Sequence, residues 1–265
     1  MGLAMEVIHG RATNPSTTIT ACTAGTGDSF AVRNFGDSGQ AMLVAQWALG
    51  ATAGIVRVRS PRIHDNVQGL RYRTVAANSQ PLFPLGQNQK LYAQDTLVVE
   101  LSGGASETDV QAYMNYYTDL PGSAARFIDT DTLKRRARNM VTVETNHTTG
   151  STAGDYGGTL ALNANFDLLK ANTDYAIVGY LTDVNVCSVG YRGPDTGNLR
   201  VGGPGTTDRY VTFRWFEELY DQLGMPCIPV INSANKAGTN IDLVHTSTST
   251  TVNLTTILAE LGPTA

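Results

Sequence analysis

Hydrophobic and polar positions alternate along much of the chain, as they do in strands with one buried face. Between residues 110 and 117 every second position is apolar, from Val110 to Tyr116, so a strand is favoured there over a helix. A longer apolar stretch at 41–56, interrupted by Gln46 and two glycines, predicts two buried strands around a glycine-containing turn. Shorter runs predict further strands at 30–32, 96–101, 159–162 and 240–244.

Two segments depart from this pattern. From Trp215 to Leu223 the apolar residues recur every three or four positions, which predicts a short helix that ends at Gly224. The segment 124–140 is densely charged, and a helix that runs to Arg138 is expected there, with Asp131 or Thr132 as its N-cap. We expect a solvated connector, and contact with an acidic neighbouring surface is the alternative.

The second half of the chain repeats landmarks of the first half. Three pairs are separated by 133 positions and keep the same order: Trp47 and Tyr180, Arg59 and Arg192, Pro61 and Pro194. Further along the offset is near 145, and the helical segment in the second half accounts for the increase. Short strands with Gly- and Pro-rich turns favour sandwiches or barrels. We therefore predict an all-β chain of two tandem antiparallel β-sandwich domains at 1–123 and 141–265, with a charged connector at 124–140 and a short helical insertion in the second domain.

Composition narrows the classes of protein. The chain has 265 residues, of which 16% are charged and only four are lysine, whereas about 25% is usual for a soluble domain. The net charge of -4 and the pI near 5.5 argue against a dedicated nucleic-acid-binding domain, whose pI would be above about 9. The longest apolar stretch is shorter than the ~20 residues of a membrane span, so we expect no transmembrane segment, and the first residues do not resemble a signal peptide.

Residue types that carry chemistry are scattered. The four histidines, His9, His64, His147 and His245, have no metal-ligand spacing, and the pair His64-Asp65 is read as part of a turn. Cys22, Cys187 and Cys227 are expected to be buried free thiols. No catalytic, cofactor-binding or metal-ligating residue is predicted, and we expect that the protein is not an enzyme.

Arginines form the other visible group: Arg57, Arg59, Arg71, Arg73, Arg192 and Arg200. Because Arg59 and Arg192 occupy equivalent positions of the repeat, we expect them to pair with carboxylates, either within the fold or at a contact between subunits.

The duplication, length, β pattern and helical insertion together resemble the double jelly-roll capsid proteins of tailless viruses and phages. That resemblance implies that both sandwich domains are jelly-roll-like and that trimers tile a shell. The expected partners are therefore copies of the chain and other virion proteins, and the expected location is the virion. A low charge content agrees with surfaces buried in interfaces. The alternatives are a phage cement, adaptor or tail protein, and a carbohydrate-binding protein that would use Trp47, Tyr180 or Tyr191.

Overall fold

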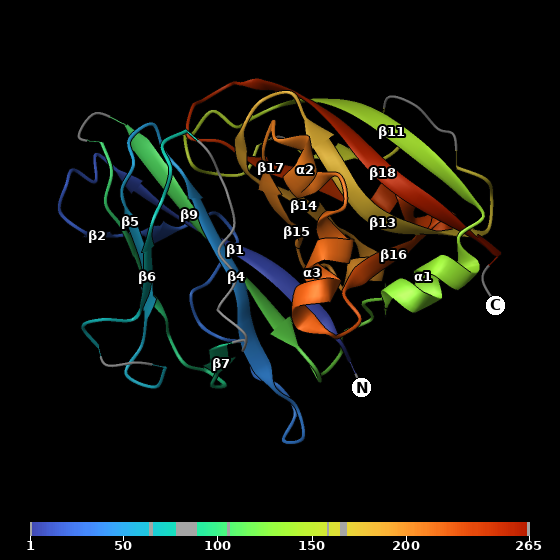
Figure 1. Ribbon diagram of the computed structural model, residues 1–265, viewed down its shortest axis with the longest axis horizontal. Helices are drawn as coiled ribbons and strands as arrows, with labels where there is room; N and C mark the ends of the chain where they lie inside the picture. Colours follow the sequence, from blue (N-terminus) through green and yellow to red (C-terminus); the bar gives the residue numbers. More distant parts are fainter. Residues whose placement is uncertain are drawn as a thin grey trace.

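The computed structural model describes residues 2–63, 66–77, 89–104, 107–157, 159–164 and 169–263. Its strands form four antiparallel sheets, two in each half of the chain (Figure 1). Sheet I has the order β3 (Thr23–Ala24), β1 (Ala4–Thr13), β9 (Thr108–Tyr117), β4 (Ala41–Leu49), β7 (Gln89–Leu91). Sheet II has the order β2 (Thr20–Ala21), β8 (Val98–Leu101), β5 (Ile55–Arg59), β6 (Leu70–Arg73).

The second half contributes the other two sheets. Sheet III has the order β10 (Phe127–Ile128), β16 (Ile228–Asn232), β13 (Thr173–Thr182), β18 (Thr251–Pro263), β11 (Asn139–Thr148). Sheet IV has the order β12 (Leu160–Ala161), β17 (Asn240–Val244), β14 (Val186–Arg192), β15 (Val201–Gly205). The helical segments are α1 (Thr130–Arg136), α2 (Arg209–Thr212) and α3 (Trp215–Leu223), with short 3₁₀ turns at Pro194–Thr196 and Ser233–Gly238.

Both halves have the same strand order. If β3 and β10 are set aside as additions at sheet edges, each half has eight strands that can be numbered in chain order. In both halves one sheet then runs 1-8-3-6 and the other runs 2-7-4-5. Eight antiparallel strands in two such sheets make a jelly roll, so the chain consists of two jelly rolls in tandem, as the sequence predicts.

The repeated landmarks lie on equivalent strands. Trp47 is on β4 and Tyr180 is on β13, which are the third strands of their jelly rolls. Arg59 ends β5 and Arg192 ends β14, which are the fourth strands. Strand position and sequence offset therefore agree at these two pairs of residues.

The four sheets stack in the order II, I, IV, III (Figure 1). Sheet I is therefore buried on both faces, and β9 has only one half-buried residue, Thr108. The sequence predicts a strand at 110–117, which β9 confirms, and the burial of both of its faces is a feature of the structure. Tyr113 and Tyr117 pack in the core between sheets I and II, whereas Val110 and Met114 pack in a core shared with the second jelly roll.

The helices agree with the sequence in part. Helix α3 covers the predicted residues, and Gly224 ends it in the left-handed conformation, with φ of 65°. Helix α1 ends at Arg136 rather than Arg138, and its N-cap is Asp129 rather than Asp131 or Thr132. The reason is local: Asp129 has an extended backbone, and its side chain accepts a hydrogen bond from the Thr132 main-chain N–H.

The predicted strands differ more in length. The segment 41–56 does contain two strands around a turn, and 240–244 is a strand in full. The run 96–101 pairs continuously only from Val98, the run 159–162 shortens to β12, and 30–32 keeps a single bridge from Ala31 to Thr96. The pair His64-Asp65 lies outside the described residues. Within the described ranges, no helix combines the length and apolar character needed to cross a membrane.

Candidate functional site

The two jelly rolls meet through an apolar contact between sheets I and IV. Trp47 is fully buried, and its Nε1 donates a hydrogen bond to the Cys187 carbonyl at 2.6 Å. The Trp47 ring also meets the edge of Trp215, with 6.1 Å between ring centroids. These residues belong to one hydrophobic core that runs without interruption from the first jelly roll into the second. Burial of apolar surface stabilises a contact by about 25 cal/mol per Å², so this core fixes the jelly rolls against each other.

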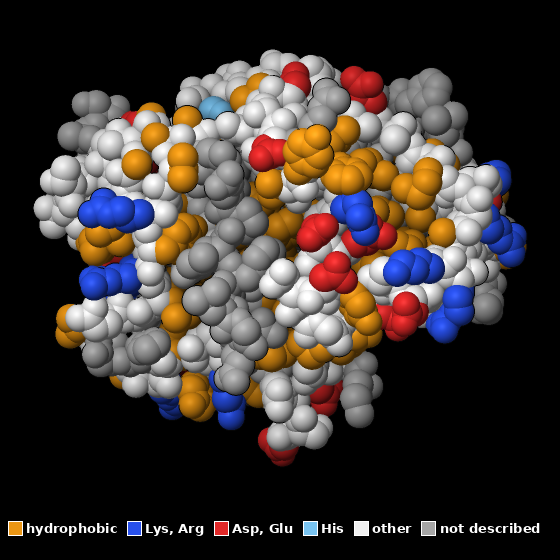
Figure 2. All heavy atoms as spheres, viewed as in Figure 1, with side chains coloured by type: hydrophobic (Ala, Val, Ile, Leu, Met, Phe, Trp, Pro, Cys, Tyr) orange, Lys and Arg blue, Asp and Glu red, His pale blue; other side chains and the backbone are white. Residues whose placement is uncertain are grey.

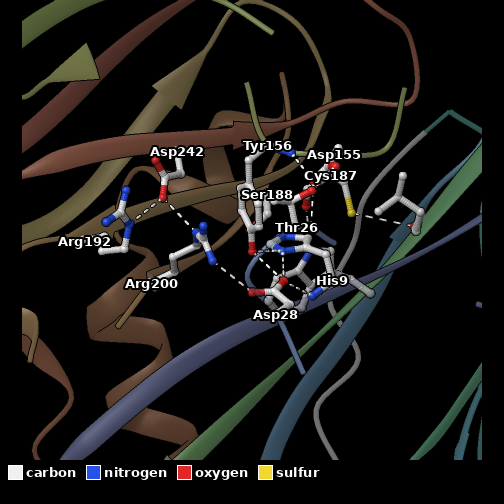
Figure 3. A network of polar contacts seen from close by, with 12 residues as sticks. His9, Thr26, Asp28, Asp155, Tyr156, Cys187, Ser188, Arg192, Arg200 and Asp242 are labelled. Carbon is white, nitrogen blue, oxygen red and sulfur yellow. Dashed lines mark hydrogen bonds and ion pairs between the residues drawn. The ribbon is translucent and has the colours of Figure 1, made fainter. Parts of the chain in front are cut away.

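A polar network lies beside the apolar contact and crosses the same boundary (Figure 3). Its centre is Asp28 of the first jelly roll, whose side chain is only 5% exposed. Asp28 accepts hydrogen bonds from the His9 main-chain N–H at 2.8 Å and from the Tyr156 hydroxyl at 2.7 Å. Arg200 of the second jelly roll donates to it at 2.9 Å. Three donors from both halves therefore hold one buried carboxylate.

Arg200 continues the network into the second jelly roll. Its guanidinium carbon lies 3.5 Å from the centroid of the Tyr156 ring, and its Nε donates to Asp242 at 2.7 Å. Asp242 also accepts from Arg192 Nε at 2.9 Å. Burial alone would raise the pKa of Asp242, but the hydrogen bonds from the two arginines lower it below its usual value. Asp242 thus stays ionised and fixes both arginines at the boundary.

A main-chain contact and a second carboxylate add to the network. The Val7 N–H donates to the Arg200 carbonyl at 2.8 Å, which joins β1 to the segment before β15. Asp155 accepts hydrogen bonds from Thr26 (Figure 3). It also forms an ion pair with Arg11. The contacts of Val7 and Asp155 each join one jelly roll to the other, so they help to fix the relative position of the two.

Equivalent ion pairs occur inside both jelly rolls. Arg59 binds Glu100 of β8 through two parallel hydrogen bonds of 2.8 and 2.9 Å, and Arg192 binds Asp242 of β17. Both pairs join the fourth strand to the seventh strand of their jelly roll. Of the two alternatives that the sequence leaves for Arg59 and Arg192, the structure shows the pair within the fold.

The outer face of sheet II is basic. Arg57 and Arg59 share Glu100, whereas Arg71 and Arg73 of β6 are exposed and form no ion pair with any described residue. Lys and Arg side chains are seen over β5 and β6 in Figure 2. Because one buried carboxylate balances only one of four arginines, this face carries an excess of positive charge.

Sheet III is partly covered by helical segments, whose exposed charges are of both signs. Helices α2 and α3 pack on β13, and a groove of about 310 Å³ runs between them, α1 and β18. Apolar side chains line it, among them Met140 and Phe213, which are 59% and 40% exposed. Helix α3 exposes Glu218 and Asp221 beside the groove. Figure 2 shows hydrophobic side chains gathered over these helices, with acidic ones next to them.

The aromatic residues considered for carbohydrate binding are not on any surface. Trp47, Tyr180 and Tyr191 are each 0% exposed. The Tyr180 hydroxyl donates to the Pro204 carbonyl at 3.1 Å, and the Tyr191 hydroxyl lies 2.8 Å from the Thr256 hydroxyl. These side chains are core residues, so they offer no platform on which a sugar ring could stack.

The histidines and cysteines stay apart. His9 joins the polar network, whereas His147 is buried elsewhere, and burial lowers its pKa to about 4. Within the described ranges no three His, Cys, Asp or Glu side chains gather closely enough to hold a metal ion. All three cysteines are free, with Cys187 and Cys227 buried and Cys22 half-buried, so the prediction of free thiols is confirmed and burial is complete for two of them.

Sequence reasoning found part of the network. Arg192 and Arg200 belong to the arginine group, and the alignment of the repeat singled out Arg192. Residues 9, 28 and 156 carry no motif, because their spacing along the chain is long and irregular. Only the packing of sheet I on sheet IV brings them together.

Comparisons with known proteins place few constraints on the chain. No protein-family model and no curated protein sequence matches it. Among solved structures it is similar to the PBSX exported protein XepA, at 12% identity and TM-score 0.29 over 96% of this chain and 86% of that one. It is also similar to the major capsid protein P2 from bacteriophage PM2, at 9% identity and TM-score 0.25 over 97% of both chains. A third similarity, to the STIV MCP, has 8% identity and TM-score 0.22 over 98% of this chain and 97% of that one. Similarities of this size carry no argument, so the fold rests on the strand order and the function on the surfaces.

Proposed function

We propose that the chain is a virion structural protein, a capsid shell subunit that assembles with copies of itself into trimers. The observation that carries the proposal is that the two jelly rolls of one chain pack through unlike faces. Sheet I, of the 1-8-3-6 type, meets sheet IV, of the 2-7-4-5 type. A contact between unlike faces is heterologous, and it forms a ring when its rotation closes.

The two outer faces of the chain, on sheets II and III, are the counterparts of the two faces that meet inside it. Sheet III is equivalent to sheet I, and sheet II is equivalent to sheet IV. A second copy can therefore place its sheet III against sheet II of the first copy, much as the two jelly rolls pack within one chain. Three copies joined in this way form a ring of six jelly rolls.

Charge supports this pairing of faces. Sheet II exposes Arg71 and Arg73, while α3, which packs on β13 of sheet III, exposes Glu218 and Asp221. Complementary potentials favour a specific register between partners. The apolar groove beside α3 supplies the kind of surface that an interface core buries. The low charge content of the whole chain agrees with extensive burial of its surface between subunits.

The proposal includes other virion proteins as partners and the virion as the location. It assigns no catalytic activity, cofactor or sequence-specific contact with nucleic acid to the chain. Carbohydrate binding through Trp47, Tyr180 or Tyr191 receives no support, because these aromatic residues are buried. A cement, adaptor or tail protein would use the same jelly rolls. An oligomeric state other than a trimer would distinguish such a protein from a shell subunit.

Size-exclusion chromatography with light scattering over a range of concentrations tests the proposal. We expect a mass three times that of the chain and ring-shaped particles in negative stain. A species that stays monomeric at high concentration would contradict a shell subunit.

Charge reversal tests the pairing of the two faces. We expect Arg71→Glu with Arg73→Glu to yield monomers, and Glu218→Arg with Asp221→Arg to do the same. The chain that carries all four changes should recover the trimer, because every contact then has the opposite polarity. Thermal melts verify that each variant is folded like the parent chain. If the folded chain with all four changes is still a monomer, sheet II does not face α3.

A further inference from the structure

A polar pocket of about 420 Å³ opens where the two jelly rolls meet. Its walls come from β1, from the segment 27–33 and from the chain just before β15, and Arg33, Arg192 and Arg200 line it together with Glu6 and Asp28. A volume of this size lies within the range of small-molecule sites. Neither the packing of the jelly rolls nor the proposed trimer requires an open pocket here.

Two of the arginines have unused donors. Arg33 contacts Glu6 through Nε alone at 2.6 Å, and its side chain is 48% exposed. Arg192 contacts Asp242 through Nε alone, and its side chain is 33% exposed. The terminal nitrogens of both side chains therefore have no partner among the described residues. They come from opposite jelly rolls and face one pocket.

The acidic side chains of the same wall have unused acceptor capacity. Glu6 Oε1 accepts one hydrogen bond, from the Tyr117 hydroxyl at 2.7 Å. Asp28 Oδ1 likewise accepts one, from Arg200. A carboxylate oxygen has two lone pairs, so each of these atoms can accept a further hydrogen bond from a ligand hydroxyl.

We propose that this pocket binds a hydroxylated oxyanion of monosaccharide size, such as a sugar acid or a sugar phosphate. The terminal nitrogens of Arg33 and Arg192 bind the oxyanion, since planar guanidinium groups form paired hydrogen bonds with carboxylate and phosphate. Glu6 and Asp28 accept from the ligand hydroxyls. Among the described residues no aromatic ring lines the pocket, so binding depends on the charged group.

Titration calorimetry on the full chain tests the proposal with four probes: glucuronate, glucose 6-phosphate, glucose and inorganic phosphate. We expect binding of glucuronate, glucose 6-phosphate or both, which also shows whether the oxyanion is a carboxylate or a phosphate. Glucose should bind at least tenfold more weakly because it lacks the charge. Inorganic phosphate should bind at least tenfold more weakly because it lacks the sugar hydroxyls.

Variants show whether the binding occurs in this pocket. We expect Arg33→Gln and Arg192→Gln each to weaken binding at least tenfold, whereas Arg62→Gln, at an exposed arginine outside the pocket, leaves it unchanged. Arg33 is half-exposed, so its variant keeps the fold even if Arg192→Gln does not, and thermal melts verify this. The absence of binding by both anions, or unchanged binding by Arg33→Gln, would overturn the proposal. Because the assay detects binding in monomer and trimer alike, its result is independent of the proposed assembly.

Discussion

At the scale of single residues, the interior of the first jelly roll contains polar side chains without partners. The Tyr113 hydroxyl, Gln46 Oε1 and Asn115 Oδ1 are buried and form no hydrogen bond with a described residue. A buried polar group without a partner costs about 1–3 kcal/mol. Tyr117, four residues after Tyr113 on the same strand, instead donates to Glu6 at 2.7 Å. These unsatisfied groups therefore make the interior of the first jelly roll less stable than its extent of burial alone would give.

These two tyrosines provide a matched test. We expect Tyr113→Phe to raise the free energy of unfolding by about 1 kcal/mol, because it removes a hydroxyl that has no partner. Tyr117→Phe should lower it by about 1–3 kcal/mol, because it removes the donor to the buried Glu6 Oε1 and leaves Glu6 with Arg33 alone. Urea unfolding measures both values, and equal destabilisation by the two variants would contradict the assignment.

Asp109 provides a test of pH dependence. Burial and the neighbouring Glu107 raise its pKa from 3.8 to about 7. Between about pH 4 and pH 7 the folded chain then binds more protons at this site than the unfolded chain, so the contribution of Asp109 to stability falls as pH rises. We expect Asp109→Asn to melt close to the parent chain at pH 5 and above it at pH 8. Comparing variant with parent separates Asp109 from His147, whose lowered pKa acts in the opposite direction. An equal difference at both pH values would contradict the prediction.

At the scale of elements, α3 depends on a close approach to β15. The Trp215 side chain lies against Gly203, where an added Cβ would come within 2.2 Å of the indole ring, and Trp215 Nε1 donates to the Gly202 carbonyl at 2.9 Å. The helix period in the sequence predicts α3 but not this contact, because the contact depends on which strand lies below the helix. The same indole meets Trp47, so the position of α3 also affects the boundary between the jelly rolls.

Substitution of Gly203 tests this approach. We expect Gly203→Ala to destabilise the chain by about 1–3 kcal/mol, as overpacked cores do. Gly238→Ala serves as the control, because its added Cβ would have an ordinary contact of 3.7 Å with Pro194, and a change within about 0.5 kcal/mol is expected. Tryptophan fluorescence during urea unfolding reports both, since Trp47 and Trp215 lie at the contact. A Gly203→Ala chain as stable as the control would show that α3 moves freely.

At the scale of the whole molecule, the continuous core makes the two jelly rolls energetically dependent on each other. One hydrophobic cluster contains residues from sheets I, III and IV, and the network around Asp28 crosses the same boundary. Removing one partner of such a buried charge leaves the other uncompensated, which costs several kcal/mol. Neither jelly roll can separate without exposing apolar surface and breaking ion pairs.

Cooperative unfolding follows from this arrangement. We expect hydrogen exchange in mild denaturant to show one opening free energy for β8 of the first jelly roll and β18 of the second. Trp47→Ala should lower both by a similar amount, about 3–5 kcal/mol, because it creates a cavity at the shared core. A decrease confined to β8 would show that the jelly rolls unfold independently.

The sequence by itself determined the fold class, the tandem organisation, helix α3 and the importance of Arg59 and Arg192. Each of these follows from periodicity or from repetition at a nearly constant offset. Both signals can be read from the order of residues alone. Only the tertiary structure decided that β9 is buried on both faces, that Glu100 and Asp242 are the partners of those arginines, and that residues 9, 28, 156 and 200 meet. The physical reason is that periodicity reports how a strand lies relative to water, whereas these contacts depend on which sheets stack together, and stacking joins residues that are distant in the chain.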